Sequence, residues 1–481
     1  MRPNYVAAIV ASGALSIASG PFMFASNRMG YSGQRTAATT NTQYQTDWIT
    51  FDSPPYDIIS PKFLFQGFYC DNQTTFEHNL GNDVLHQGVA LEIAGTRYPL
   101  TVGSASSFTV TDGSWVWTDD NTIVIPANSR CRIGVATYVP TGQYRLTSFR
   151  CNATDGDGFK AASTDVSSYL VSGALSTTPN TWQSGPVLMI AKGWQAAGKP
   201  PVPLLIGDSI LKGGNDDNYW NENPRIVGDI ARAINDNTSS TRYPYANLGV
   251  PGVAYFTQSL FTKRFQILSD AGWPFTSIIS EMGINSSNGT SAISGWPAWG
   301  AFLKTMGNKP IVQTTLLPKV TLGAANLETT TLANQTKTDF ENFNNWVRAK
   351  TDANISGFID RGGIVESAPG SGLWAVPGFS TTLAAAYTAG QLQVTLTDSP
   401  PIGCSLLLDP GLSTYKQLGV VTAVSGTGPY VATVGKGASS SFASGVTATA
   451  CLSNDGLHPL STATLMLVPA TIAAKNAGVI V

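Results

Sequence analysis

The chain is short of charge. Lys, Arg, Asp and Glu make up only 12% of its 481 residues, and the formal net charge is −2 at pH 7. A nucleic-acid-binding surface needs clustered basic residues, so this composition gives no electrostatic basis for a nucleic-acid partner. The chain also lacks heptads, long charge runs and a repeat that extends over its full length. At this length we expect two or three domains rather than one.

Cysteine is scarce as well, and no two of the five cysteines stand in C-x-x-C spacing. That spacing is typical of zinc and redox sites, so we expect neither a metal nor another cofactor. Cys404 and Cys451 bracket a late β-rich stretch. Two interpretations of this pair are open: a disulfide bond, or two buried thiols.

No apolar run is continuous enough for a membrane span. Residues 6–25 are mildly apolar and follow Arg2, but Ser12, Gly13 and Pro21 interrupt them. Such a segment resembles a weak signal peptide and fits a membrane span poorly. Two interpretations are open: a cleaved signal peptide, or an N-terminal arm that stays ordered or attaches to a virion. We expect an extracellular protein in either case, secreted or part of a virion.

Short β-like runs dominate the first part of the chain. Residues 1–46 are predicted to form an N-terminal arm or linker, because 26–46 is polar and lacks periodicity. Between 47 and 195, apolar runs such as 88–93 and 131–139 alternate with turn residues, and no helical pattern intervenes. Regular short strands without helices predict an all-β sandwich domain.

The pattern changes near residue 196, where apolar strands begin to alternate with amphipathic stretches. This alternation predicts an α/β fold, with a parallel sheet flanked by helices. Residues 377–452 break the rhythm with further strand-like runs and are predicted to form a small inserted β-module. The α/β domain therefore covers 196–376 plus 453–481. We expect its strands at 204–209, 245–250, 277–282, 310–317 and 357–365, and its helices at 224–234, 253–271, 291–306, 332–353 and after 460.

One histidine, His458, lies in the predicted α/β domain, whereas His78 and His86 fall in the β-sandwich region. Upstream of it, the predicted strand 204–209 breaks at Ser209. If this domain uses a serine nucleophile with an imidazole base, the base must be His458. The chain order Ser, Asp, His also supplies a nucleophile, an orienting acid and a base, which is the minimum set for acyl transfer.

Four short strings then fall in a characteristic order. They are Gly207-Asp208-Ser209, Asn247-Leu248-Gly249-Val250-Pro251-Gly252, Glu281-Met282-Gly283-Ile284-Asn285 and Asp455-Gly456-Leu457-His458-Pro459. Together they resemble the Ser, Gly, Asn and His blocks of the SGNH (GDSL-type) hydrolase family. The resemblance covers about residues 186–376 plus 453–481, and it implies a flavodoxin-like parallel sheet.

The resemblance also implies roles for individual residues. Ser209 matches the nucleophile, His458 the base and Asp455 the acid that orients the imidazole. The implied oxyanion hole consists of the backbone N–H groups of Ser209 and Gly252 and the side-chain amide of Asn285. Such donors must already point at the place where negative charge develops.

Each of these residues also has a purely structural interpretation. Ser209 could cap a helix, Asp455-Gly456 could be a turn, Asn285 an Asx-turn residue and Gly252 a turn glycine. The coincidence of all four strings in order favours the catalytic interpretation. Asp208 is expected to have a structural role at its turn.

The chain departs from the family pattern at two positions. Ile210 replaces the usual Leu after the serine, and Ser286 stands where an Asp often follows the Asn. Neither position carries a catalytic role. The residues that bind substrate are not identified by any motif. Aromatic residues are candidates either for a sugar site or for core packing: Tyr219, Trp220, Trp296 and Trp299.

Two functions are compatible with these observations. The first is a metal-independent serine esterase that removes acetyl or other small acyl groups, most plausibly from an acylated glycan. The second is a phage tail-fibre, spike or surface adhesin module that binds host glycan, with the esterase site accessory or vestigial. Either function allows a homo-oligomer or a virion assembly. The glycan in both cases is inferred by analogy with the family and from the β-rich domains.

Overall fold

The computed structural model describes most of the chain. The described residues are 20–29, 34–70, 77–147, 149–150, 156–177, 182–214, 228–235, 242–254, 261–286, 289–320, 337–375, 378–409, 416–435, 437–453 and 457–481. Asp455, Tyr219 and Trp220 lie outside them. No helix in the described part of the chain is both long and apolar enough to cross a membrane.

The N-terminal part forms two antiparallel sheets. The first has the order β1 (Met23–Phe24), β17 (Leu188–Lys192), β4 (Ile58–Gln66), β10 (Trp115–Trp117), with β11 (Val124–Ile125) also on β4. The second has the order β15 (Gly158–Ala162), β3 (Tyr44–Asp52), β12 (Arg130–Tyr138), β7 (Val84–Ile93), β8 (Thr96–Leu100), with β9 (Phe108–Val110) also on β7. Alternate side chains from both sheets fill one core between them, which includes Phe51, Phe63, Leu91 and Ile133.

Smaller elements complete this part of the chain. They are the strand pairs β2 (Gln34–Ala37) with β13 (Tyr144–Thr147), β5 (Phe68–Cys70) with β6 (Glu77–Asn79) and β14 (Phe149–Arg150) with β16 (Trp182–Gln183), and the short helix η2 (Ser167–Leu170).

The structure differs from the expected N-terminal arm over 1–46. In the described part of that segment, β1 pairs with β17, β2 pairs with β13, and β3 already begins at Tyr44. Met23 and Phe24 are buried. A strand that joins a sheet edge is held by backbone hydrogen bonds to its neighbour, so it needs no periodic pattern of its own. The β-sandwich therefore begins well before residue 47.

The α/β part is built on a parallel sheet. Its strands are ordered β19 (Ala246–Asn247), β18 (Pro203–Gly207), β20 (Ser277–Glu281), β21 (Ile311–Thr314), β22 (Ile355–Ile359), and all four neighbouring pairs are parallel. In chain order this is 2-1-3-4-5, the order of flavodoxin-like doubly wound sheets. The predicted α/β class, with a parallel sheet flanked by helices, is confirmed.

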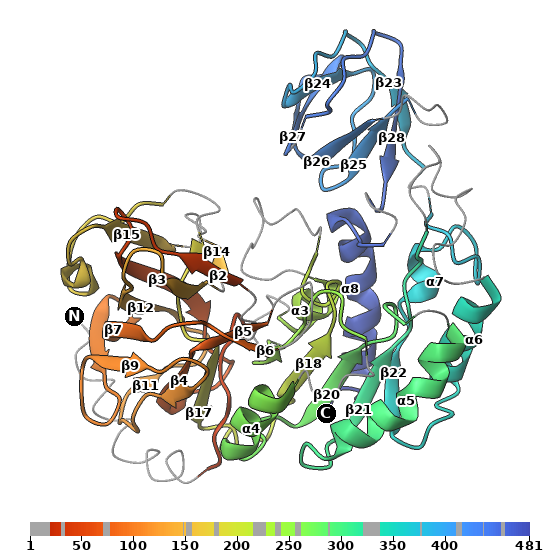
Figure 1. Cartoon of the computed structure of the whole chain (residues 1–481). Helices are drawn as coiled ribbons and strands as arrows, with labels where there is room; N and C mark the ends of the chain where they lie inside the picture. Colours follow the sequence, from red (N-terminus) through yellow and green to blue (C-terminus); the bar gives the residue numbers. More distant parts are fainter. Residues whose placement is uncertain are drawn as a thin grey trace.

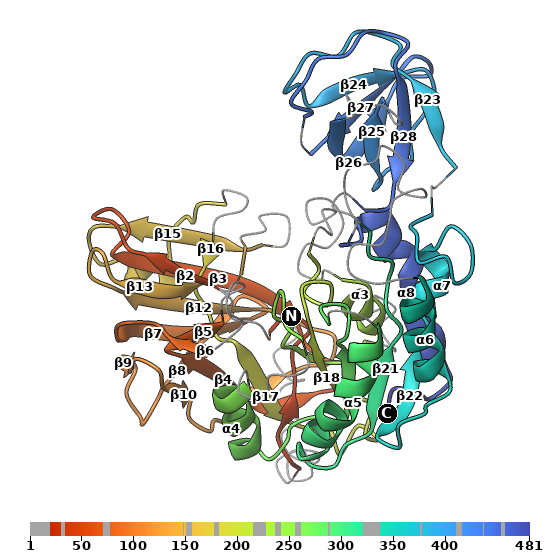
Figure 2. The same ribbon diagram turned by 45° about the vertical axis from the view of Figure 1, so that its right-hand side comes forward.

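Helices cover both faces of this sheet, as Figures 1 and 2 show. They are α3 (Asp229–Ile234), α4 (Thr262–Asp270), α5 (Gly289–Lys304), α6 (Lys337–Arg348), α7 (Gly362–Val365) and α8 (Ser461–Asn476). Neighbouring strand residues point to opposite faces. Leu205 packs in one cluster with α3 and α8, whereas Leu204 packs in another with α4, α5 and α6. Strands buried on both faces explain the continuous apolar runs in the sequence.

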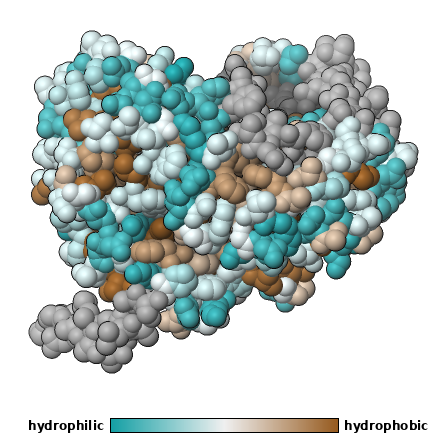
Figure 3. Space-filling model, turned by 60° about the horizontal axis from the view of Figure 1, so that its bottom comes forward, coloured by the Kyte–Doolittle hydropathy of each residue, from teal (hydrophilic) through white to brown (hydrophobic). Residues whose placement is uncertain are grey.

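The β-sandwich and the α/β domain share part of their core. Phe24, Leu64 and Phe68 of the sandwich belong to the same buried cluster as Leu204. An ion pair between Glu77 of β6 and Arg264 of α4, at 2.8 Å, adds a buried polar contact. On the face turned forward in Figure 3, hydrophobic residues lie in small patches among hydrophilic ones.

The inserted β-module lies between α7 and α8 in the chain and stands next to the start of α8 in Figures 1 and 2. Its strands are ordered β23 (Ser380–Thr382), β28 (Thr447–Cys451), β25 (Ser405–Leu408), β26 (Lys416–Ser425), β27 (Tyr430–Val434), β24 (Gln393–Leu396). The module has its own buried cluster. Cys404 and Cys451 are buried thiols rather than a disulfide, so the second interpretation of this pair holds.

Deleting residues 378–450 and joining the ends with a short Gly/Ser linker is expected to leave the α/β domain folded. The two ends are already adjacent, because the Ala450 N–H donates to the Phe379 carbonyl at 3.1 Å. Leu407 and Val420 pack in the main core, and burial of one such side chain is worth roughly 1.5–3 kcal/mol. The Tm should therefore fall, while circular dichroism keeps its helical signal. Insoluble protein would show that the module is required for folding.

Candidate active site

The site residues lie where the order of the parallel sheet reverses. β18 is the first strand of the sheet in the chain, and its neighbours β19 and β20 are the second and third. Ser209 follows the end of β18, and Asn285 follows the end of β20. Ligands of open α/β sheets bind outside the carboxyl ends of the strands at such a switch point. The fold therefore brings both predicted residues to the position where a site is expected.

The structure brings Ser209 and His458 together. His458 Nε2 lies 2.6 Å from Ser209 Oγ. Both side chains are half-buried, and His458 lies in the loop before α8. This is a hydrogen-bond distance, at which an imidazole can accept the proton of a serine hydroxyl. Asp455, the predicted orienting acid, lies outside the described residues, so its role stays a prediction.

Gly214 makes room for this contact. It follows the Ser209 turn, and its N–H donates to the Ser209 carbonyl at 2.8 Å. A Cβ at this position would lie 2.9 Å from that carbonyl oxygen and 3.1 Å from His458 Cδ2. Any side chain would therefore push against the imidazole. The sequence motifs did not single out this glycine, and only the three-dimensional contact identifies it.

Two of the expected oxyanion donors are backbone groups. Within the described part of the chain, the N–H groups of Ser209 and Gly252 have no hydrogen-bond acceptor. Gly252 has a φ of 77°, a left-handed conformation that favours glycine. These properties suit an oxyanion hole, and the assignment of the two groups stays a prediction.

The Asn285 amide has protein acceptors in this structure. Its Nδ2 donates to Asp208 Oδ2 at 3.0 Å and to the Val253 carbonyl at 3.1 Å. An amide nitrogen carries two hydrogens, so a contact with an oxyanion requires one of these bonds to be shared or released. The oxyanion role of Asn285 therefore stays a prediction, and Asp208 and Val253 define where the amide lies.

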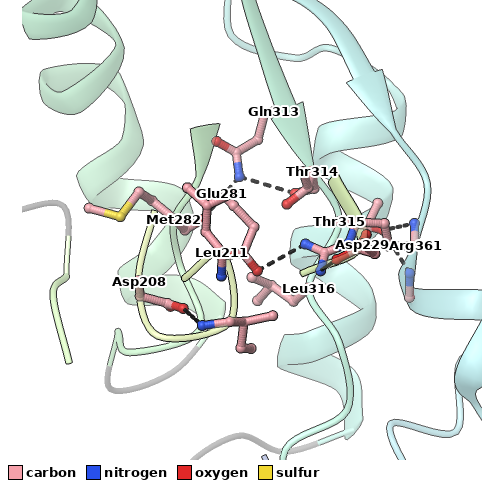
Figure 4. Close-up of polar contacts among 12 residues, drawn as sticks. Asp208, Leu211, Asp229, Glu281, Met282, Gln313, Thr314, Thr315, Leu316 and Arg361 are labelled. Carbon is pink, nitrogen blue, oxygen red and sulfur yellow. Dashed lines mark hydrogen bonds and ion pairs between the residues drawn. The ribbon is translucent and has the colours of Figure 1, made fainter. Parts of the chain in front are cut away.

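Behind the serine lies a buried network of charged groups, shown in Figure 4. Arg361 is completely buried, and its guanidinium donates to Glu281 Oε1 at 2.9 Å and to Asp229 Oδ1 at 2.7 Å. Glu281 Oε2 accepts from the Leu211 N–H at 3.0 Å. Asp208 Oδ1 accepts from the Ile210 N–H at 2.8 Å, which is the structural turn role expected for Asp208. The two residues that follow Ser209 are thus both held by carboxyl groups.

Burial controls the ionisation of this network. Burial raises the pKa of Asp208 well above its usual range, and the neighbouring Glu281 charge raises it further. Burial also raises the pKa of Glu281, although Arg361 opposes this shift. Lys319 donates to the Ile284 carbonyl at 3.0 Å, and burial lowers its pKa while Asp208 opposes that shift.

Sequence reasoning missed Glu281, Asp229 and Arg361 as parts of the site's support. One signal was present: Glu281 is an ionisable residue within a strand that is otherwise apolar or small. Such a residue is rarely buried without a partner. The partner, Arg361, follows β22, a strand far away in the chain, and nothing in the sequence joins the two.

The aromatic candidates divide into two groups. Trp296 and Trp299 are buried in the core, where their indole N–H groups donate to Gln313 Oε1 at 2.9 Å and to Ser280 Oγ at 3.2 Å. Core packing is therefore the correct alternative for these two residues. Tyr219 and Trp220 lie outside the described residues. Among the residues that the structure describes, no group of three or more His, Cys, Asp or Glu side chains could hold a metal ion.

Comparison with known proteins yields remote likenesses. No protein-family model matches the chain, and no curated protein matches it. The structure is similar to an acylhydrolase from Bacteroides fragilis, with 13% identity, 58% of this chain and 88% of that chain covered, and a TM-score of 0.29. The structure is also similar to a salicylyl-acyltransferase from a tetracycline biosynthetic pathway, with 12% sequence identity and a TM-score of 0.28. The aligned region covers 92% of this chain and 84% of that chain.

A third similar structure is a variant of an acetylxylan esterase from Geobacillus stearothermophilus, with 13% sequence identity and a TM-score of 0.21. The aligned region covers 34% of this chain and 77% of that chain. At these scores the likeness is remote, and the functional argument has to come from the site itself.

Proposed function

We propose that the chain is a serine esterase of SGNH type. The observation that carries this proposal is the 2.6 Å contact between Ser209 Oγ and His458 Nε2 at the switch point of the parallel sheet. The two residues are far apart in the chain, and they are the serine and the histidine that the four-block resemblance selects. The sequence motifs and the three-dimensional contact thus select the same two residues independently, which argues against a chance contact.

The proposed reaction has two halves. Ser209 Oγ attacks the acyl carbon while its proton passes to His458 Nε2, and the ester C–O bond then breaks as that proton moves to the departing alcohol oxygen. Water attacks the acyl-serine in the same way, and the acid leaves. The tetrahedral oxyanion in each half would be met by the N–H groups of Ser209 and Gly252 and by the Asn285 amide. Each such donor can lower the barrier by about 3 kcal/mol.

The proposed substrate is a small acyl ester, namely an O-acetyl group on a carbohydrate. Support for the acyl part comes from the nucleophile and base. Support for the carbohydrate comes from the family resemblance and from the two β-rich domains beside the α/β domain, which is an argument by analogy. Release of acetate from an acetylated polysaccharide, compared with release from a small chromogenic acetyl ester, tests this choice.

Ser209→Ala is expected to abolish turnover of a chromogenic acetyl ester and to leave the fold intact, because this side chain lies in the turn after β18 and is only half-buried. The matched control is Ser277→Ala at the opposite end of the sheet. The Ser277 hydroxyl is buried and has no hydrogen-bond partner in the described residues, so its removal should leave activity unchanged. Wild-type turnover in Ser209→Ala would show that the nucleophile is misassigned.

His458→Ala is expected to lower kcat by at least roughly 10³-fold, because His458 Nε2 contacts the Ser209 hydroxyl and is the proposed acceptor of its proton. His78→Ala in the β-sandwich is the control and should retain activity. Equal losses in the two variants would assign the effect to folding rather than to catalysis.

Asn285→Ala is expected to lower kcat by about 10²–10³-fold with little change in KM, because an oxyanion donor acts on charge that exists only in the transition state. Steady-state kinetics on a small acetyl ester measure both constants. A large rise in KM at unchanged kcat would place Asn285 in substrate binding and remove it from the oxyanion hole.

A further inference from the structure

Asp208 and Glu281 form a pair of buried carboxyl groups directly beneath the nucleophile. Asp208 is completely buried and Glu281 is 5% exposed. Gly207 at the end of β18 pairs with Glu281 at the end of β20, and Asp208 directly follows Gly207, so the two carboxyl groups lie on neighbouring strand ends. Two carboxylates in contact repel, and burial removes the water that would screen them. A contact of this kind is stable only when one of the two groups carries a proton.

Among the described residues, the other charges near this pair come from three further elements. Arg361 follows β22, Asp229 begins α3 and Lys319 follows β21, whereas Glu281 of the pair ends β20. Three carboxyl groups therefore surround one buried guanidinium, with the half-buried Lys319 at the edge of the network. One protonated carboxyl leaves two carboxylates to balance Arg361 and Lys319. With all three ionised, the buried network would carry an excess negative charge.

The hydrogen bonds indicate which carboxyl keeps the proton. Glu281 and Asp229 each accept from the Arg361 guanidinium. Asp208 accepts only from neutral groups in the described residues, the Ile210 N–H and the Asn285 amide. A guanidinium stabilises the ionised form of its partner, and within the described residues no guanidinium donates to Asp208.

We propose that Asp208 stays protonated in the folded protein at neutral pH and donates this proton to Glu281, so that the pair positions the Ser209 turn and the Asn285 amide. The pair accepts the N–H groups of both residues that follow Ser209, together with one hydrogen of the Asn285 amide. Asp208 and Glu281 are positioning residues in this proposal. Their effect on catalysis rests on the proposed esterase function, whereas their ionisation does not.

The shared proton has a defined pH signature. Burial and Glu281 raise the pKa of Asp208 in the folded protein, whereas an aspartate in an unfolded chain has a pKa of about 3.9. The folded protein therefore holds a proton that the unfolded chain has lost. Its contribution to stability is complete below about pH 4, and it is lost as the pH rises through the folded pKa. One proton changes the folding equilibrium constant by about tenfold per pH unit in that window.

The experiment compares the full-length wild type with Asp208→Asn by denaturant unfolding between pH 4 and 8. Asparagine is neutral at every pH, retains an oxygen for the Ile210 N–H and can donate to Glu281. As the pH rises, the folding equilibrium constant of the wild type should fall relative to that of Asp208→Asn by up to about tenfold per pH unit. Asp360→Asn, which removes an exposed carboxylate paired with Arg348, is the control and should follow the wild-type pH dependence.

Glu281→Gln tests which group is ionised. Because Glu281 is the charged partner of Arg361, its neutral isostere should destabilise the protein more at pH 7 than Asp208→Asn does. The opposite ranking, or parallel pH profiles of wild type and Asp208→Asn, would overturn the proposal. Failure of Asp208→Asn to fold would also overturn it, because a position that already holds a neutral carboxyl should accept a neutral isostere.

The proposed positioning of the Asn285 amide by Asp208 is tested separately, by the kinetics of Asp208→Asn. Asparagine at 208 offers a single oxygen, so the Asn285 amide loses an acceptor, and kcat on a small acetyl ester should fall by about 10–10²-fold at nearly unchanged KM. Unchanged kcat would remove the positioning role. If the wild type hydrolyses no ester, the esterase proposal fails, while the unfolding comparison still decides whether Asp208 holds the proton.

Discussion

The geometry of the site depends on the two buried ion pairs that Arg361 forms with Glu281 and Asp229. Arg361 lies after the last strand of the parallel sheet and reaches Glu281 at the end of β20 and Asp229 at the start of α3. Its backbone N–H also donates to Thr315 Oγ1 at 2.7 Å, which ties it to the end of β21. Removing one partner of a buried ion pair typically costs about 3–5 kcal/mol, because the other charge is left without compensation. These contacts join the ends of strands whose relative positions define the site.

The arrangement above this network follows from the parallel sheet. All of its strands end at one edge, so residues from separate sequence blocks meet there without any contact between the blocks in the chain. Glu281 holds the Leu211 N–H and Asp208 holds the Ile210 N–H, so the turn that carries Ser209 has little freedom. In the proposed mechanism, a serine held in this way needs little reorganisation before it attacks the ester.

Much of the fold could be predicted from the sequence. The strand predicted at 277–282 is β20, Ser277–Glu281, and the helix predicted at 291–306 is α5, Gly289–Lys304. Both were readable because buried parallel strands are continuously apolar and because helices alternate with them. The strands within 1–46 could not be predicted in the same way. β2 consists of Gln34–Ala37, and its pairing with β13 depends on a partner more than a hundred residues away.

The sequence by itself determined the class of fold, the separation of the β-rich regions from the α/β domain, and the choice of Ser209 and His458, because strand and helix periodicity and short motifs are local properties of a chain. Only the tertiary structure decided that His458 Nε2 lies 2.6 Å from Ser209 Oγ, that Trp296 and Trp299 belong to the core, and that Cys404 and Cys451 remain thiols. It also decided that Arg361 binds Glu281 and Asp229, and that Asp208 and Glu281 accept the N–H groups of the two residues after Ser209. These are contacts between residues far apart in the chain, and their energies depend on burial and distance, which no local pattern encodes.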